Sequence, residues 1–302
     1  MLTLLAIIPS IILLIFIYKK DKKEKEPFKI LLLCLFMGIL TAIPAVIIET
    51  IEDEIVSSFF SEGSFYYAIL DGFIVAALTE EFCKYLFLKW ATYKSKYFDC
   101  MFDGIVYSVF VSLGFATLEN LLYVFEGGIG IAIVRMLTAV PGHMCFAVYM
   151  GYYYSKAKLA DVKGDRIELK KNKKKALLVP MLIHGVYDCL IMFEEDAVGD
   201  DFVSMAVMLW LVCVIALFIS TFIFVSKASK NDEYILISPS GDSKVINFNY
   251  VSEWKCSNNH ICRGNYCAFC GEKRLQLAEW ICPSCKERAY YNFCPRCGHK
   301  KM

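Results

Sequence analysis

The chain has 302 residues, of which 57% are hydrophobic and only 21% are charged. A soluble protein of this length needs a polar surface, so the composition excludes a purely soluble chain and indicates several helices in a lipid bilayer. The formal net charge of +1 argues against a protein that binds nucleic acid through net positive charge, and we predict no specific nucleic-acid partner.

Seven runs of residues are apolar and long enough to cross a bilayer, which takes roughly 20 mostly apolar residues. In chain order they are 2–18, 30–48, 67–90, 103–125, 129–154, 176–193 and 202–225. The first run has no basic segment before it and no obvious cleavage site of small residues, so we expect a retained helix rather than a signal peptide. Gly127-Gly128 predicts a tight hairpin between the fourth and fifth runs. The sequence therefore predicts an all-α polytopic membrane domain over 1–225.

The loops between these runs alternate in charge. Three of them hold 6, 2 and 9 basic residues, namely 19–29, 91–102 and 155–175. The other three hold no basic residue and 5, 1 and 5 acidic ones, namely 49–64, 126–128 and 194–201. Because positively charged loops stay in the cytoplasm, seven crossings predict a cell-membrane protein with its N-terminus outside and its C-terminal tail in the cytosol.

Ionisable side chains occur inside four consecutive runs, the third to the sixth, whereas the first, second and seventh runs carry no charge at depth. The polar set in these runs comprises Glu80, Glu81, Lys84, Glu119, Asn120, Arg135, His143, His184 and Asp188. A charge in hydrocarbon is costly unless it faces a cavity or a partner, so this clustering indicates a functional pocket. Arg135 lies near the outer interface, and we expect it to extend towards water.

Helical geometry brings several of these groups to one level of the membrane. A rise of ~1.5 Å per residue places Glu80, His143 and His184 near the middle of a ~30 Å hydrocarbon core. Glu80 shares a helix face with Lys84 four residues later, and His184 shares one with Asp188. A Glu beside a neutral His can activate water, and a second His with an Asp can stabilise an oxyanion. The same groups could instead bind Zn²⁺, and the sequence leaves both chemistries open.

Three functions fit such a pocket: an intramembrane endopeptidase, a non-catalytic receptor or scaffold that signals through its tail, and a proton-coupled transporter. The complete Glu-Glu, His and His set favours the peptidase over the scaffold. An inverted repeat would favour the transporter, and the helix lengths show none. The sequence also lacks the H-E-x-x-H motif of zinc peptidases and the G-x-S-x-G motif of serine hydrolases.

The composition changes after Ser226. Residues 226–255 read as a linker or small β-hairpin, because alternating apolar residues flank a Pro-Ser-Gly-Asp turn. Residues 256–302 carry eight cysteines with the spacing of a double zinc ribbon, a small β domain that would hold structural zinc and bind a cytosolic protein. The first expected ligand set is Cys256, Cys262, Cys267 and Cys270, in which His260 could replace one thiol. The second set is Cys282, Cys285, Cys294 and Cys297.

Four motifs, in order over about 30–195, resemble those of the PrsW family of intramembrane proteases, which is similar to the clan of CAAX-prenyl endopeptidases. The motifs are Glu80-Glu81-x-x-Lys84, Gly114-Phe115-Ala116-x-x-Glu119-Asn120, His143-x-x-Phe146 and His184-Gly185-x-Tyr187-Asp188. The resemblance implies a helical endopeptidase that cleaves a single-pass membrane protein in the lipid bilayer. Members of this family are associated with the outer-side cut of a membrane-bound anti-sigma factor, one possible substrate here.

The resemblance also implies roles for the residues. Glu80 and His143 would activate water, His184 and Asp188 would stabilise the intermediate, and Glu81 would support them. The remaining motif residues, Lys84, Glu119 and Asn120, would be supporting groups. No single helix offers two histidines four residues apart, so a metal ion in the membrane site is possible but not favoured.

Overall fold

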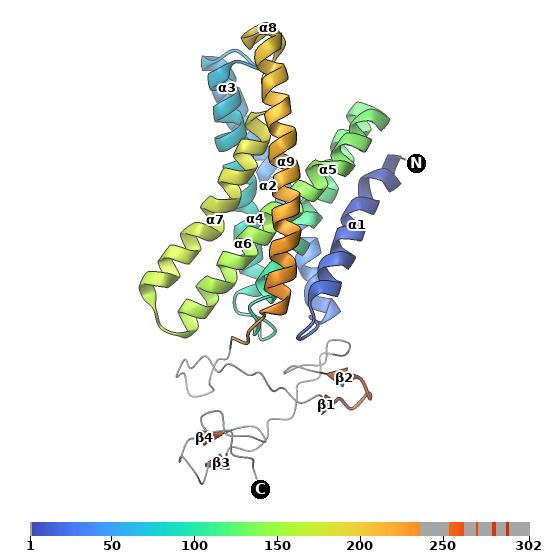
Figure 1. Cartoon of the computed structure of the whole chain (residues 1–302), viewed down its shortest axis with the longest axis vertical. Coiled ribbons are helices and arrows are strands. Elements are labelled where there is room, and N and C mark those ends of the chain that lie inside the picture. Colours follow the sequence, from blue (N-terminus) through green and yellow to red (C-terminus); the bar gives the residue numbers. More distant parts are fainter. Residues whose placement is uncertain (1, 236–253, 263–269, 271–279, 282–287, 290–302) are drawn as a thin grey trace.

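The computed structural model of the chain describes residues 2–235, 254–262, 270, 280–281 and 288–289. Helices dominate the part up to Lys230 and lie side by side along the long axis of the molecule (Figure 1). They are α1 (Leu2–Lys20), α2 (Phe28–Phe59), α3 (Phe65–Leu70), the π-helix η1 (Asp71–Leu78), α4 (Thr79–Thr92), α5 (Asp103–Leu137), α6 (Ala139–Val162), α7 (Arg166–Cys189), α8 (Glu195–Val198) and α9 (Asp200–Lys230).

Four stretches of the described chain are long and apolar enough to cross a membrane: Thr3–Lys20, Phe28–Phe59, Asp103–Val162 and Asp200–Lys230. The third stretch contains both α5 and α6. The predicted runs in α3–η1–α4 and in α7 are not among these four stretches, because α4 carries acidic and basic residues and α7 begins with a lysine-rich turn. The outer faces of α1, α2 and α9 expose large apolar side chains such as Ile12, Ile43 and Met208, as expected for contact with lipid.

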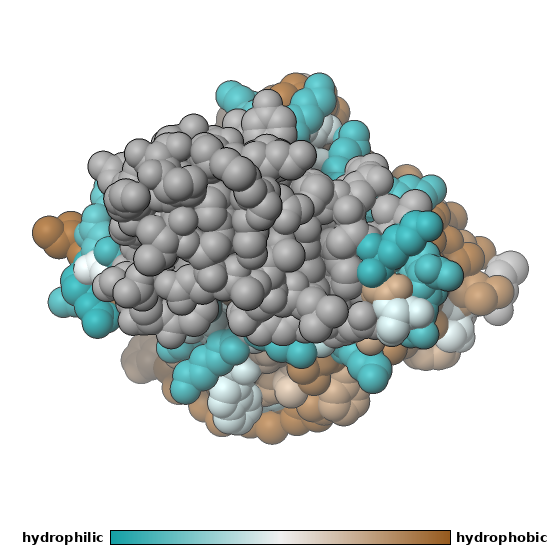
Figure 2. All heavy atoms as spheres, turned by 90° about the horizontal axis from the view of Figure 1, so that it is seen from below, coloured by the Kyte–Doolittle hydropathy of each residue, from teal (hydrophilic) through white to brown (hydrophobic). Residues whose placement is uncertain are grey.

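The loops sort to the two ends of the bundle by charge. Figure 1 places the chain that follows α1, the segment before α5 and the loop between α6 and α7 at one end, and these are the three basic loops of the sequence. The acidic connections around α3 and α8 lie at the opposite end. Figure 2 views the molecule from the basic end and shows hydrophilic residues there, with hydrophobic residues on the flanks behind them.

Several helices differ from the predicted ranges; for example, α7 begins at Arg166 rather than 176, and α9 continues to Lys230 rather than 225. α2 continues past the predicted end at 48 to Phe59, so Glu49 lies in a helix and not in a loop. The predicted hairpin at Gly127-Gly128 coincides with a break in α5, where Gly128 adopts a φ of 72° that a residue without Cβ tolerates. The predicted fifth run does not continue unbroken from 129 to 154, because Thr138 separates the end of α5 from α6. Pro141 then falls in the first turn of α6, where its missing N–H leaves no helical hydrogen bond unmade.

Glycines allow α5 to approach its neighbours closely. A Cβ on Gly114 would overlap the Leu35 carbonyl oxygen of α2, and one on Gly38 would overlap the Val111 carbonyl oxygen of α5. Nearer the start of α5, a Cβ on Gly151 of α6 would overlap the Gly104 carbonyl oxygen. Such small-residue contacts are typical of helices packed in membranes, and here they fix the positions of α2, α5 and α6 around the polar groups.

The described tail contains two short antiparallel strand pairs. β1 (Trp254–Lys255) pairs with β2 (Ile261–Cys262), and β3 (Trp280–Ile281) pairs with β4 (Arg288–Ala289). The hairpin expected within 226–255 lies largely outside the described residues. Among the eight predicted zinc ligands, Cys267, Cys282, Cys285, Cys294 and Cys297 also lie outside the described residues.

Candidate active site

A buried lysine lies at the centre of the polar residues. The Lys84 ammonium of α4 is 2.7 Å from Glu80 Oε2 and 2.9 Å from Glu81 Oε1, and its side chain is 1% exposed. It also lies 4.2 Å from the centre of the Phe115 ring of α5. Helical spacing of three and four residues brings both carboxylates to this one ammonium, which compensates the buried negative charge.

His143 of α6 joins the cluster through both ring nitrogens. Its Nδ1 is 3.1 Å from Lys84 Nζ and 3.9 Å from Glu80 Oε2, while its Nε2 is 2.8 Å from Glu119 Oε2 of α5. An ammonium only donates hydrogen bonds and a carboxylate only accepts them. These partners fit the tautomer in which Nε2 donates to Glu119 and Nδ1 accepts from Lys84.

His184 of α7 has a carboxylate at each ring nitrogen. Nδ1 is 3.1 Å from Glu81 Oε1, and Nε2 is 2.9 Å from Asp188 Oδ2. Both nitrogens must then donate, so the contacts favour the doubly protonated imidazolium. The Phe146 ring stacks on His184 with 4.4 Å between the ring centres and holds its plane. Two histidines in one pocket thus have opposite hydrogen-bonding roles.

A second ion pair supports the cluster on the side of the acidic loops. Arg135 lies 2.9 Å from Glu119 Oε1 and donates from Nε to Asn120 Oδ1 at 3.1 Å. Asn120 in turn donates to the Ala6 carbonyl oxygen of α1 at 3.0 Å. The expectation that Arg135 extends towards water is wrong: its side chain is 16% exposed and points inward to Glu119. Glu119 thereby links Arg135 to His143.

Glu49 of α2 was missed in the sequence because it follows an apolar run and was assigned to an outer loop. Its charge interacts with those of Glu80 and Glu119, and its buried Oε1 has no hydrogen-bond partner. One turn later, Glu52 accepts a hydrogen bond of 2.8 Å from Thr79 at the start of α4. The spacing of three residues between Glu49 and Glu52 places both on the face towards α4, and this periodicity was the signal that could have found them.

Glu80, His143 and His184 offer the ligands of a metal site. One atom from each lies within 4.8 Å of the other two, and all three residues are buried. One carboxylate and two imidazoles suit Zn²⁺ in type and reach. However, all four ring nitrogens already face protein partners, and the Lys84 ammonium touches both Glu80 and His143. An ion could bind these atoms only if Lys84 and a carboxylate moved away.

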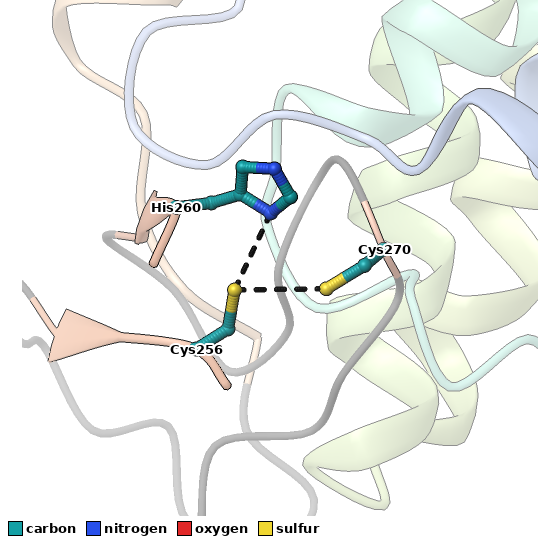
Figure 3. Close-up of side chains that lie close together, drawn as sticks. All are labelled: Cys256, His260 and Cys270. Carbon is teal, nitrogen blue, oxygen red and sulfur yellow. Dashed lines mark hydrogen bonds between the residues drawn. The ribbon is translucent and has the colours of Figure 1, made fainter. Parts of the chain in front are cut away.

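The tail contains a separate group of metal-binding side chains. Cys256 Sγ lies 3.3 Å from His260 Nδ1 and 3.6 Å from Cys270 Sγ. Figure 3 shows the three side chains pointing towards one another. Thiols and an imidazole at this separation suit zinc, and His260 lies where the sequence allowed it to replace one thiol.

The chain matches the family model described as PrsW family intramembrane metalloprotease over residues 26–218, ahead of the cysteine-rich tail. Relatives named Protease PrsW include one from Geobacillus kaustophilus (strain HTA426), 40% identical over 62% of this chain and 78% of the relative. Another from Clostridioides difficile (strain 630) is 39% identical over 63% and 79%. A third from Bacillus subtilis (strain 168) is 37% identical over 61% and 80%. No solved structure matches the chain.

Proposed function

The chain belongs to the PrsW family of intramembrane proteases, and from this premise we propose that Glu80 and His143 activate the water that hydrolyses a membrane-anchored protein substrate. The single observation that carries this proposal is the convergence of Glu80, His143 and His184 from three helices around one buried ammonium. Side chains on the acidic-loop side of this cluster, Glu119 and Asp188, are 18% and 15% exposed. A single-pass substrate approaching from that side fits this geometry.

Glu80 is the group best placed to accept the proton of the attacking water. Lys84 donates to one of its oxygens, which leaves the second oxygen to accept. As the water oxygen bonds to the carbonyl carbon, Glu80 takes one proton and later gives it to the departing amine when the C–N bond breaks. His143, fixed by Glu119 and 3.9 Å from Glu80, borders the place where the water must lie.

His184 is the group that supports the developing oxyanion. Both of its N–H groups donate to carboxylates, so His184 acts through its positive charge, which in a site of low dielectric stabilises nearby negative charge. Asp188 accepts from His184 at 2.9 Å and orients the ring. Glu81 holds the opposite ring nitrogen in the same way.

A metal ion in this pocket would be held by Glu80, His143 and His184 and would supply a Lewis acid that makes bound water more acidic. We propose that water activation needs no such ion. The Lys84 ammonium already contacts the Glu80 oxygen and the His143 nitrogen that the ion would need as ligands. In the tail we propose structural zinc, held by Cys256, Cys270 and further cysteines of the two predicted sets, in a ribbon that binds a cytosolic protein.

Metal analysis separates these two sites. The full-length protein should contain about two zinc ions per chain, as two four-ligand sites predict, and Glu80→Gln should contain the same amount. Exhaustive chelation followed by removal of the chelator should leave the rate of substrate cleavage unchanged. Activity that is lost on chelation and restored by Zn²⁺, with less zinc bound in Glu80→Gln than in the wild type, would show that the membrane site is a metal centre.

We also propose that the helices cross the bilayer seven times, with α3–η1–α4 and α7 among the crossings and the N-terminus outside. The basic loops gather at one end of the bundle in support of this topology. Epitope tags inserted at Gly164 and Gly199, which lie in turns, test it. In intact cells an added protease should remove the tag at Gly199, and it should reach Gly164 only after permeabilisation. The reverse pattern would contradict the orientation, and equal access to both tags would contradict the number of crossings.

A further inference from the structure

A second group of buried acidic residues lies at the basic-loop end of the bundle, far along α5 from the candidate active site. Three segments meet there: the loop after α1, the turn before α5 and the chain that leaves α9. Met101 N donates to the Glu233 carbonyl oxygen at 2.8 Å, and Cys100 forms an antiparallel bridge with Tyr234. We call this group the acidic junction; it comprises the buried residues Asp21, Glu24, Glu26, Asp99 and Asp103 and the half-buried Asp232.

Several oxygens of the acidic junction are buried without a hydrogen-bond donor. Asp21 is 0% exposed, and no other side chain donates a hydrogen bond to its carboxylate. Asp103 is also 0% exposed; its Oδ2 accepts from the backbone N–H groups of Asp99 and Cys100, but its Oδ1 has no partner. Asp232 accepts from Phe102 N through Oδ1, and its Oδ2 has no partner. Buried carboxylate oxygens are rarely left in this state.

The nearby lysines neutralise these carboxylates only in part: Lys25 interacts electrostatically with Asp21, and Lys23 with Asp232. Lys23 donates to the Asp232 backbone carbonyl oxygen at 2.5 Å and lies over the Tyr234 ring. Lys25 donates to the Tyr18 backbone carbonyl oxygen. Among the residues that the structure describes, no basic side chain forms a salt bridge with Asp21, Asp103 or Asp232. A charge buried this deeply needs a counter-charge or a proton.

The acidic junction also brings ligand atoms together. One carboxylate oxygen each of Glu24 and Asp99 and the Cys100 sulfur lie within 4.8 Å of one another. Asp21 is buried in the same loop between α1 and α2 as Glu24, and it interacts electrostatically with Asp99 and with Asp232. We propose that the acidic junction binds one divalent cation, with Asp21, Glu24 and Asp99 as ligands, and that this ion ties the chain leaving α9 to the turn before α5.

The donors indicate the class of ion. Carboxylate oxygens greatly outnumber the one thiol, and such donors suit hard cations such as Mg²⁺, Ca²⁺ and Mn²⁺. A proton is the competing way to neutralise the cluster, since burial raises the pKa of Asp21 to about 7. Binding is therefore best measured at pH 8, where protons compete least.

Mn²⁺ binding to the full-length protein tests the proposal, because bound and free Mn²⁺ differ in their paramagnetic resonance spectra. At pH 8 the wild type should bind one Mn²⁺ per chain that Mg²⁺ or Ca²⁺ displaces, and Asp21→Asn should weaken this binding at least ~10-fold, the scale for loss of one ligand-orienting interaction in a metal site. Glu168→Gln is the matched control: Glu168 lies on the same end of the bundle but is an exposed partner of Lys171 at 2.8 Å. It should bind Mn²⁺ like the wild type.

Thermal unfolding provides a second readout that also detects misfolding. No other side chain donates a hydrogen bond to Asp21, and an amide oxygen can still accept from the backbone, so Asp21→Asn should unfold, without Mn²⁺, at or above the temperature of the wild type. Added Mn²⁺ should then stabilise the wild type and Glu168→Gln but not Asp21→Asn. Equal shifts in all three proteins, or no bound Mn²⁺ at 1 mM, on the order of the weakest protein calcium sites, would overturn the proposal. Binding of Zn²⁺ alone, abolished by Cys100→Ser, would overturn the assignment to a hard cation.

Discussion

Replacing Glu80 with glutamine should reduce cleavage of a single-pass substrate by ~10²–10⁴, the loss expected when a general base is removed. Glutamine keeps the size of the side chain and can still pack beside Lys84, but it cannot take a proton from water. His143→Ala should lower the rate to a similar degree, because the ring bordering Glu80 and fixed by Glu119 is removed. Initial rates with purified protein in lipid, together with the elution volume and melting temperature of each variant, are the measurements.

Glu54→Gln is the matched control for this experiment. Glu54 lies on α2, as does Glu49, but its side chain is exposed, so the variant should cleave at the wild-type rate. Wild-type activity in either Glu80→Gln or His143→Ala would remove these residues from the catalytic step. Parallel loss of activity and of the folded elution peak would instead indicate a structural role.

Replacing Lys84 with methionine should damage both stability and activity. The ammonium donates hydrogen bonds to Glu80 and Glu81 and contacts the Nδ1 atom of His143. Without it two buried carboxylates lose their counter-charge. Breaking a buried ion pair from one side typically costs about 3–5 kcal/mol, so Lys84→Met should lower the free energy of unfolding by an amount of that order. The surviving folded protein should cleave slowly, because the Glu80 carboxylate then lacks the ammonium that positions it.

Two further variants separate charge from packing at Lys84. Lys89→Met alters an exposed lysine of the same helix and should leave stability and rate unchanged. Combining Lys84→Met with Glu80→Gln removes one of the orphaned charges, so the double variant should be more stable than Lys84→Met alone. If Lys84→Met unfolds like the wild type under denaturant in mixed micelles, the ammonium does not hold the cluster together.

The sequence by itself determined the features that depend on one helix at a time. Apolar runs indicated the membrane helices because hydrocarbon excludes polar residues over a fixed length of chain. The helical repeat placed Glu80 with Lys84 and His184 with Asp188, because neighbours four residues apart share a face whatever surrounds them. The same reasoning identified all the residues of the central cluster except Glu49.

Only the tertiary structure decided which groups from different helices meet. Arg135 pairs inward with Glu119, Glu49 joins the cluster from α2, and each histidine nitrogen acquires its own partner. The acidic junction likewise gathers residues from three segments distant in the chain. The physical reason is that close packing, here at Gly38 and Gly114, sets the rotation and depth of one helix against another. The residue pattern within a single helix does not specify this packing.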